Sequence, residues 1–238
     1  MRQWIGRDFA DWQAVKAAVN EQWSEGLDIF QEMLFELSKI ELPTIRCRKR
    51  RLRWDTDNGD EVDNDRLRAG QEYWRLSRRE ETRGFQTICI VTNISTSGGV
   101  SSGRVLWRGA LAVVLADLLE KQGHRVELWA ADRGLNAYEN RYGSFQAVCL
   151  KQADEPLDLV SVVNAVSGWF YRTIFFQDLK SETGSNVACG YGAPTKIDPQ
   201  DEAVRNLIGA ATPLIVDSVW SKSDCITKAR QLVAGLVS

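Results

Sequence analysis

Histidine is almost absent from this sequence, which contains only His124. A zinc site built on several histidines, or a Ser–His or Cys–His catalytic pair, would need this residue type at the reacting centre. His124 stands in the segment Gln122-Gly-His-Arg-Val, which is typical of a turn between a helix and a strand. We therefore expect a structural role for His124 and no histidine-based catalysis.

Cysteine is also scarce, and no Cys-x-x-Cys pair occurs. An odd number of cysteines at wide spacing argues against a disulfide framework. Cys89 and Cys149 fall in apolar, strand-like runs, where a thiol acts as a small hydrophobic group. We expect reduced thiols with no nucleophilic role at all five positions: Cys47, Cys89, Cys149, Cys189 and Cys225.

Long apolar runs are missing as well. No run approaches the roughly 20 residues that a membrane-spanning helix needs. The first eight residues lack the apolar stretch of a signal peptide. The net charge of −2 provides no global attraction to nucleic acid. We therefore expect a folded cytoplasmic protein that does not associate with a membrane.

Residues 8–40 carry apolar side chains at spacings of three and four, which predicts helices. Gly26 is expected to separate two of them. Trp4, Trp12 and Trp23 are widely spaced, and a lone helical hairpin could not bury all three rings. We therefore expect them to be aromatic anchors against a larger surface. They would dock either onto the chain's own domain or onto a partner.

Residues 44–54 are predicted to form a basic strand, and an acidic turn at 55–65 follows it. The turn does not fit an EF-hand, because Gly59 and Arg66 occupy the fifth and twelfth loop positions counted from Asp55. A helix is expected at 63–82. The cations of the basic strand could pair with the acidic turn, or they could bind a nucleic-acid backbone: Arg46, Arg48, Lys49, Arg50, Arg51 and Arg53.

From Gln86 onward, short apolar runs alternate with amphipathic helices, which predicts a Rossmann-like α/β fold with a mainly parallel sheet. This divides the chain into an N-terminal helical and basic-strand extension, 1–84, and an α/β domain, 85–238. Strands are expected at 87–92, 125–131, 145–150, 186–189 and 214–219. Helices are expected at 104–122, 156–180, 199–208 and 223–236.

Ligands of a parallel α/β sheet bind at the carboxyl ends of its strands. The first predicted strand ends in Asn93-Ile-Ser-Thr-Ser97, which has polar side chains at alternate positions. Their oxygens could converge on one point, and hard cations such as Mg²⁺ or Mn²⁺ favour oxygen ligands. This strand end is the main candidate site.

The motif resembles the metal-ion-dependent adhesion site of the von Willebrand factor A family, which begins with Asp-x-Ser-x-Ser. Residues 107–128 and Gly192-Ala-Pro194 are similar to the cobaltochelatase-subunit branch of that family. The resemblance implies a three-layer sandwich with a Mg²⁺ or Mn²⁺ site that includes Asn93, Ser95 and Ser97.

The match departs from the family at two carboxylates, because Asn93 and Tyr191 stand where the family has aspartate. Neutral groups attract a cation less, so a weakened site is expected. Asp154 and Asp158 could compensate from the next predicted strand end.

A second interpretation uses the glycine-rich loop 97–103, whose amides and following helix could hold a phosphate. The loop resembles the opening unit of GT-B glycosyltransferases, but it lacks G-x-G-x-x-G and a Walker lysine. Arg108 is expected on the solvated face of the helix beside Arg104. The candidate phosphate residues are Gly98, Gly99, Ser101, Ser102 and Arg104.

No catalytic set is recognisable, and Lys151 is the one lysine at a predicted strand end that could act as a nucleophile. The sequence favours a non-enzymatic protein-binding or assembly module that uses its strand-end loops. The alternatives are a phosphate- or nucleotide-sugar-binding transferase and a nucleic-acid-binding protein.

Overall fold

The computed structural model describes residues 5–39, 53–57, 59, 61–76, 87–136, 141–178, 193–209 and 213–237. The chain forms two compact units, one made of residues 1–45 with 87–238 and the other of residues 46–86. This division differs from the boundary expected after residue 84, because the N-terminal helices share the unit that contains the main sheet.

The main sheet contains β4 (Thr87–Asn93), β5 (Arg125–Asn136), β6 (Arg141–Lys151), β7 (Ala193–Pro194) and β8 (Leu214–Val216). Its order is β6-β5-β4-β8, and the short β7 pairs with β5. Strand β4 is parallel to β5 and β8, whereas β6 and β7 are antiparallel to β5. The α/β class is therefore correct, with a mixed sheet.

The third predicted strand, 145–150, exists within β6 but runs opposite to its neighbour. Only four residues separate β5 from β6, whereas a parallel crossover needs a dozen or more. The strand predicted at 186–189 lies outside the described residues.

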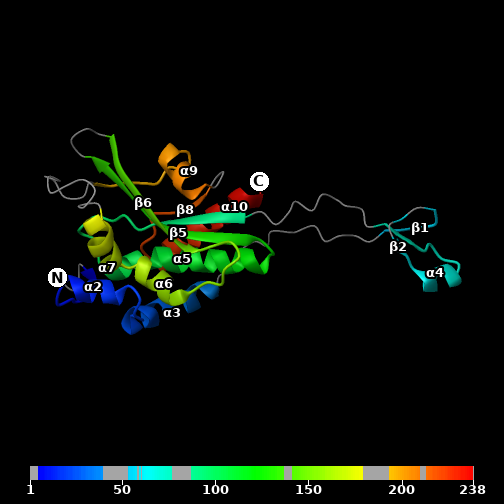
Figure 1. Cartoon of the computed structure of the whole chain (residues 1–238), viewed down its shortest axis with the longest axis horizontal. Helices are drawn as coiled ribbons and strands as arrows, with labels where there is room; N and C mark the ends of the chain where they lie inside the picture. The colour runs from blue at the N-terminus through cyan, green and yellow to red at the C-terminus, as the bar shows by residue number, and fades with distance from the viewer. Residues whose placement is uncertain are drawn as a thin grey trace. The chain divides into compact units, whose positions relative to one another are not determined.

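Strand β4 is the point at which the strand order reverses, because the chain goes from β4 to β5 on one side and later places β8 on the other. In open α/β sheets the ligand crevice lies outside the carboxyl ends of the strands at such a point. In Figure 1, β4 runs toward the end of the unit at which α7 lies.

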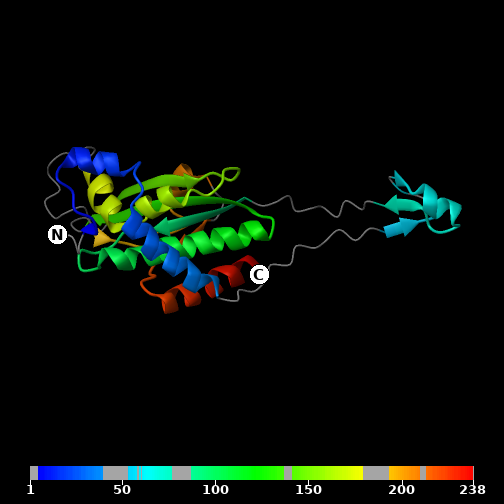
Figure 2. The same ribbon diagram turned by 90° about the horizontal axis from the view of Figure 1, so that it is seen from below.

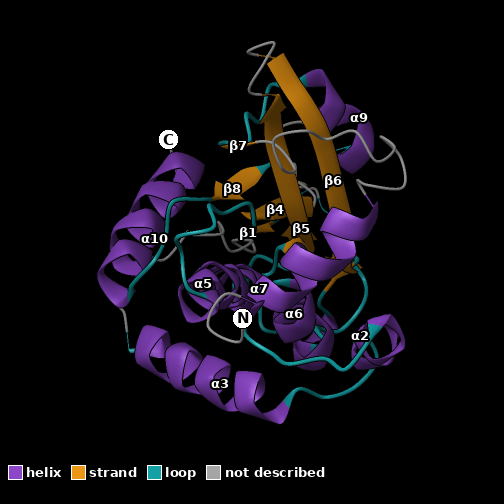
Figure 3. Ribbon diagram, turned by 90° about the vertical axis from the view of Figure 1, so that its left-hand side faces the viewer, coloured by secondary structure: helices purple, strands orange, loops and turns teal. Residues whose placement is uncertain are grey.

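The side chains of β4 alternate between two apolar clusters. Ile88 and Ile90 pack with α5 (Ser102–Lys121), while Cys89 and Val91 pack with Ile208 of α9 (Glu202–Ile208) on the other face. Figure 3 shows α5 and α9 on different sides of the sheet. Helices therefore cover both faces, which makes three layers.

Helices α2 (Trp12–Ala18) and α3 (Ser24–Ser38) pack within this unit, and of the three expected anchors Trp23 lies against its apolar cluster. Phe30 and Leu37 of α3 are buried in the cluster that includes α5. The Asn164 Nδ2 donates to the Glu21 carbonyl at 2.9 Å, which ties the segment after α2 to α6. Figure 2 shows α3 crossing α5 beside α10 (Lys222–Val237).

The break between the first two helices falls at residues 19–23 rather than at Gly26. Gly26 lies in the first turn of α3, where a Cβ atom would come within 2.1 Å of the Trp23 ring. The glycine is therefore needed for packing. Of the other two anchors, Trp12 is 37% exposed and Trp4 lies outside the described residues.

The helix predicted at 156–180 is divided into α6 (Leu159–Ala165), α7 (Gly168–Phe170) and the π-helix η1 (Tyr171–Phe175). Ser167 starts α7, since its hydroxyl accepts from the Phe170 amide at 3.2 Å. Among the described residues, no single helix is long and apolar enough to span a membrane. The bent pair Leu159–Ala165 and Gly168–Asp178 could do so by length and composition only.

Helix α5 contains two glycines in different surroundings, and they give a packing prediction. A Cβ at Gly109 would lie 2.3 Å from Val166, whereas a Cβ at Gly103 would meet nothing within 4 Å. We expect Gly109→Ala to lower the free energy of unfolding by about 1–3 kcal/mol through overpacking. Gly103→Ala should leave it unchanged or raise it by up to about 1 kcal/mol. Urea unfolding measures both, and equal effects would contradict the packing at Gly109.

The second unit is a small antiparallel sheet of β1 (Arg53–Asp55), β2 (Glu61–Val62) and β3 (Trp74–Leu76) with helix α4 (Asn64–Arg68). The helix predicted at 63–82 is wrong between Ala69 and Leu76, where the chain leaves α4 and forms β3, and its remainder, 77–82, lies outside the described residues. Gly70 adopts a φ of +66°, which glycine adopts readily, and the chain then turns into β3.

Candidate functional site

The site begins with Asn93, whose side chain is committed to hydrogen bonds. Its Oδ1 accepts from the Ser95 amide at 2.9 Å, and its Nδ2 donates to the Thr195 carbonyl at 2.9 Å. The Thr195 amide donates in turn to the Arg133 carbonyl at 3.1 Å. The chain after β7 therefore meets the β4 loop, whereas Tyr191 and Gly192 lie outside the described residues.

Arg108 holds the base of this loop. It is 3% exposed, so the expectation of a solvated side chain is wrong. Its Nη1 donates to the carbonyls of Asn93 and Ser95 at 2.5 and 2.8 Å, and its guanidinium lies 3.7 Å from the Trp220 ring centroid. Burial lowers the pKa of Arg108 to about 10, so it stays charged at neutral pH.

Arg172 of η1 holds the tip of the same loop. Its Nη2 donates to the carbonyls of Ser97 and Val100 at 3.2 and 2.7 Å, and Arg172 itself is 4% exposed. The residues between these anchors, Ser97, Gly98 and Gly99, are exposed. The loop thus presents a tip to solvent while its backbone is fixed from inside.

Asp132 lies at the carboxyl-end half of β5 and is 3% exposed. Burial raises its pKa from 3.8 to about 6, and hydrogen bonds from Ser95 and Tyr171 only partly oppose this. Its Oδ1 atom has no hydrogen-bond partner among the described residues. Such a group is unusual in a folded protein and marks a candidate site.

Two neighbours connect Asp132 to the loop. The Tyr171 phenol is buried next to Asp132, and its pKa is raised by burial and by that carboxylate. It also hydrogen-bonds Ser95 and the Thr96 backbone. The Thr96 hydroxyl is buried without a partner among the described residues. Tyr171 begins the π-helix, and π-helical segments are frequent at functional sites.

The predicted metal ligands do not all meet. Ser95 is buried beside Asp132, and its hydroxyl donates to the Arg133 carbonyl at 3.3 Å, whereas Ser97 is exposed. Asn93 turns its oxygen toward the Ser95 amide. Among the described residues, no group of three or more His, Cys, Asp or Glu side chains could hold a metal ion.

Asp154 and Asp158 are not brought to this loop, and the expectation that they compensate there is wrong. Because β6 is antiparallel, Lys151 pairs with Leu128, and the chain leaves β6 toward the amino end of β4. Asp154 is exposed there. Asp158 caps α6, since its carboxylate accepts from the Val160 amide at 3.0 Å and from the Ser161 hydroxyl at 2.5 Å.

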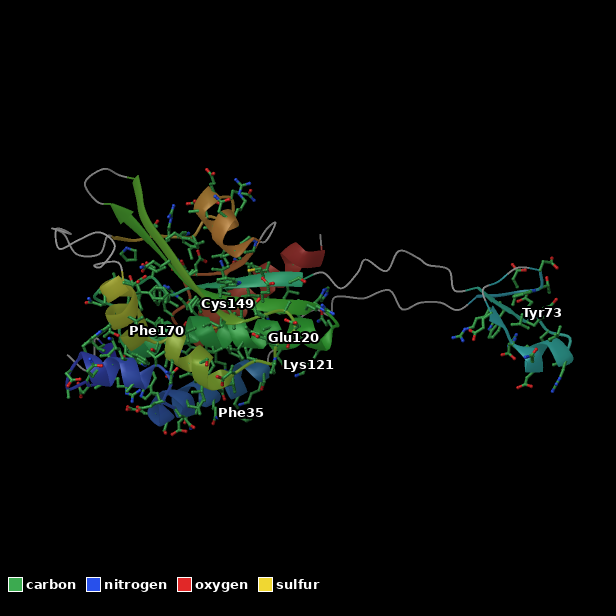
Figure 4. All side chains as sticks on the ribbon, in the orientation of Figure 1. Phe35, Tyr73, Glu120, Lys121, Cys149 and Phe170 are labelled. Atoms are coloured by element: carbon green, nitrogen blue, oxygen red, sulfur yellow. The ribbon has the colours of Figure 1, made fainter. Side chains whose placement is uncertain are left out.

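Lys151 is also structural rather than nucleophilic. Its ammonium group donates to the Val126 carbonyl at 2.9 Å and pairs with Glu120 at 2.7 Å. Figure 4 shows Glu120, the partner of Lys151, toward the end of the unit away from Phe170 of α7.

The buried thiols are not activated either. Burial raises the pKa of Cys89 to about 12 and also raises the pKa of Cys149.

Gly98 and Gly99 of the glycine-rich loop that could hold a phosphate are exposed. A Cβ at Gly99 would meet nothing within 4 Å, and Arg104 is exposed. Ser101 caps α5 without a side-chain hydrogen bond. The Ser102 side chain lies against Gly6 and Gly168, where a Cβ would come within 3.0 Å of it. The start of α5 is therefore partly covered.

The proposed nucleic-acid strand lies mostly outside the described residues, which include only Arg53 of its six cations. The adjacent aromatic residue, Trp54, is covered by the Arg66 guanidinium at 4.3 Å from the ring centroid. One face of its indole is thus covered by a residue of helix α4 within the second unit.

The segment after β8 also lies at the carboxyl-end edge of the main sheet, because β8 is parallel to β4. Ser218 has a φ of +53°, a conformation that costs energy for a residue with a Cβ and often occurs at functional positions. Asp217 pairs with Lys228 at 2.5 Å, and Asp224 accepts from the Trp220 amide at 3.0 Å. These carboxylates therefore stabilise the segment that carries Trp220.

Sequence reasoning missed Asp132, Tyr171 and the buried arginines. The one available signal was Asp132 itself, a carboxylate that follows the apolar run Leu128-Trp-Ala-Ala131 at the end of a buried strand.

Comparisons with known proteins give one match. A family model described as "Domain of unknown function (DUF7192)" matches residues 1–236. No curated protein and no solved structure matches the chain. The family match covers both compact units together with the N-terminal helices.

Proposed function

The chain belongs to the DUF7192 family, and we propose that it is a non-enzymatic protein-binding or assembly module. It engages its partner through the loops at the carboxyl ends of its strands. The observation that carries this proposal is the loop 93–100, whose tip is exposed while Arg108 and Arg172 fix its carbonyls from inside.

A loop held in this way suits binding, because a preorganised surface loses less conformational freedom when a partner docks. The fixed positions are backbone carbonyls, so the exposed tip can vary in side chain without losing its shape. The Ser97 hydroxyl and the two glycines that follow it form the contact surface in this proposal.

We also propose that the main unit has a von Willebrand A-type fold. Across the sheet, β6, β5, β4 and β8 are the third, second, first and fourth strands in chain order. This order, 3-2-1-4, matches the first four positions of the doubly wound order 3-2-1-4-5-6. The hydrogen bond between Asn93 and Thr195 supports this, since it joins the strand-end motif to the residue that directly follows Gly192-Ala-Pro194.

Affinity capture from cells that naturally express the protein tests the binding proposal. We expect Ser97→Arg to reduce recovery of the specific partner at least tenfold, because the arginine would stand on the exposed tip. Asp154→Arg is the matched control, because Asp154 is exposed on the opposite edge of the sheet. Full recovery with Ser97→Arg, or loss with Asp154→Arg, would refute the assignment of this edge.

A further inference from the structure

We propose that the second unit, residues 46–86, is a self-association module that pairs with the same unit of a second copy of this chain. The contact is made by the face of its small sheet that carries Val62 and Trp74. The proposed function concerns the strand-end loops of the main unit, so this inference goes beyond it and depends on different residues.

The first argument is the size of the second unit. None of its described side chains is buried, and Trp54, Tyr73 and Trp74 are each only half-buried. A domain of about 40 residues usually needs a disulfide, a metal or oligomerisation to be stable. Cys47 is the one cysteine of residues 46–86, which excludes an internal disulfide, and the described residues include no group of side chains that could hold a metal ion. Association is the remedy that these residues support.

The second argument is the arrangement of apolar side chains on the small sheet. Val62 pairs directly with Trp74 in the antiparallel register, so the two side chains lie on one face. The opposite face carries Trp54, which the Arg66 guanidinium of α4 covers. The turn before β2 reaches Trp74 at Gly59, but Val62 stays 36% exposed. The Val62 face is therefore the one that a second chain can cover.

The third argument is charge, and it favours a second copy over another partner. Strands β1 and β2 form the two edges of the sheet, because β3 lies between them. The sequence that leads into β1 and includes its first residue carries six cations at 46–53. Glu61 of β2 is flanked by Asp60 and Asp63. The unit thus carries both signs of charge, one toward each edge.

This charge distribution also selects the geometry of the pair. Edge-to-edge pairing of β1 with β1, or of β2 with β2, would bring like charges together. Face-to-face pairing about a two-fold axis parallel to β3 instead places β1 of each copy over β2 of the other. The basic sequence of one copy then meets the acidic residues of its partner twice, as an isologous interface requires.

Sedimentation velocity of the full chain, with EDTA present, tests the proposal. Two three-stranded faces make a small interface, so we expect a reversible dimer with a dissociation constant of about 10–100 µM. Samples from about 1 to about 200 µM should therefore change from monomer to dimer. Val62→Glu should raise the dissociation constant at least about tenfold, because the new charge would be buried in the interface. Raising NaCl from about 50 to about 500 mM should raise it about threefold.

Three further variants show whether the effect is specific. Phe35→Glu is the matched control, because Phe35 is 64% exposed on α3 of the main unit, and it should leave the dimer intact. Val62→Thr keeps a β-branched side chain in the strand, so it preserves the sheet and should still weaken the dimer about threefold. Ser97→Arg should also leave the dimer intact, which separates failure of self-association from failure of partner capture by the loop tip.

A wild type that stays monomeric at all of these concentrations would overturn the proposal. Equal dimerisation of the wild type and Val62→Glu would also overturn it, as would loss of the dimer in Phe35→Glu. A dimer that salt does not weaken would contradict the face-to-face arrangement.

Discussion

Methionine in place of Arg108 is expected to lower the free energy of unfolding by about 3 kcal/mol and to loosen the strand-end loop. Two carbonyls, those of Asn93 and Ser95, would lose their donor. A buried carbonyl left unsatisfied costs about 1–3 kcal/mol. The contact with the Trp220 ring, worth about 1–2 kcal/mol when desolvated, would also be lost. Methionine carries no charge, so the substitution also removes the desolvation cost of the buried guanidinium, which offsets part of this total.

Urea unfolding measures the stability change, and hydrogen exchange of the amides from Ser95 to Val100 measures the loosening. Arg104→Met is the matched control, because Arg104 is on the same helix but exposed, and it should change stability by less than about 0.5 kcal/mol. Equal effects of the two substitutions, with unchanged exchange in the loop, would show that Arg108 does not hold it.

Asparagine in place of Asp132 is expected to stabilise the metal-free protein at neutral pH. The pKa of Asp132 rises from 3.8 to about 6 on folding, mainly because of burial. At 1.36 kcal/mol per pH unit, this difference corresponds to roughly 3 kcal/mol. The native state binds the Asp132 proton more tightly than the unfolded state does, so protonation of Asp132 stabilises the native state by this amount. That contribution is complete below about pH 4 and is lost as the pH rises through 6.

Asparagine is neutral at every pH, so it removes this loss. The amide hydrogens of the new asparagine need partners, which offsets part of this effect. The free energy of unfolding should therefore rise by about 1–2 kcal/mol at pH 7.5 and stay unchanged at pH 4. Urea unfolding with a chelator present at both values measures the effect. Asp158→Asn is the control of opposite sign, because the Ser161 hydroxyl lowers the pKa of Asp158. If Asp132→Asn destabilised the protein at pH 7.5, the cost assigned to the buried carboxylate would be wrong.

Local patterns in the sequence predict much of the fold. The apolar run of β4, the long helix α5 and the closing helix α10 lie where periodicity places them. The direction of β6 could not be predicted in the same way, because an apolar run such as Phe145–Leu150 reads identically in a parallel or an antiparallel strand. That one direction decides whether Asp154 and Asp158 reach the site.

The site itself was predictable only in part. Asn93 and Ser95 share one short motif, so sequence spacing brings them together. Arg108 was misjudged because α5 is buried on most of its circumference, with Val105, Leu106 and Gly109 also enclosed, which weakens the helical pattern that marks a solvated face. Tyr171 approaches from a distant π-helix, and no spacing rule connects it with Asp132.

The claim that the carboxyl-end edge of the sheet is the binding surface is tested most directly by photo-cross-linking in cells. A benzophenone amino acid would replace Ser97 at the loop tip in one variant and Asp154 on the opposite edge in another. We predict a specific cross-linked partner from position 97 and none from position 154. A partner that cross-links only from position 154 would contradict the account.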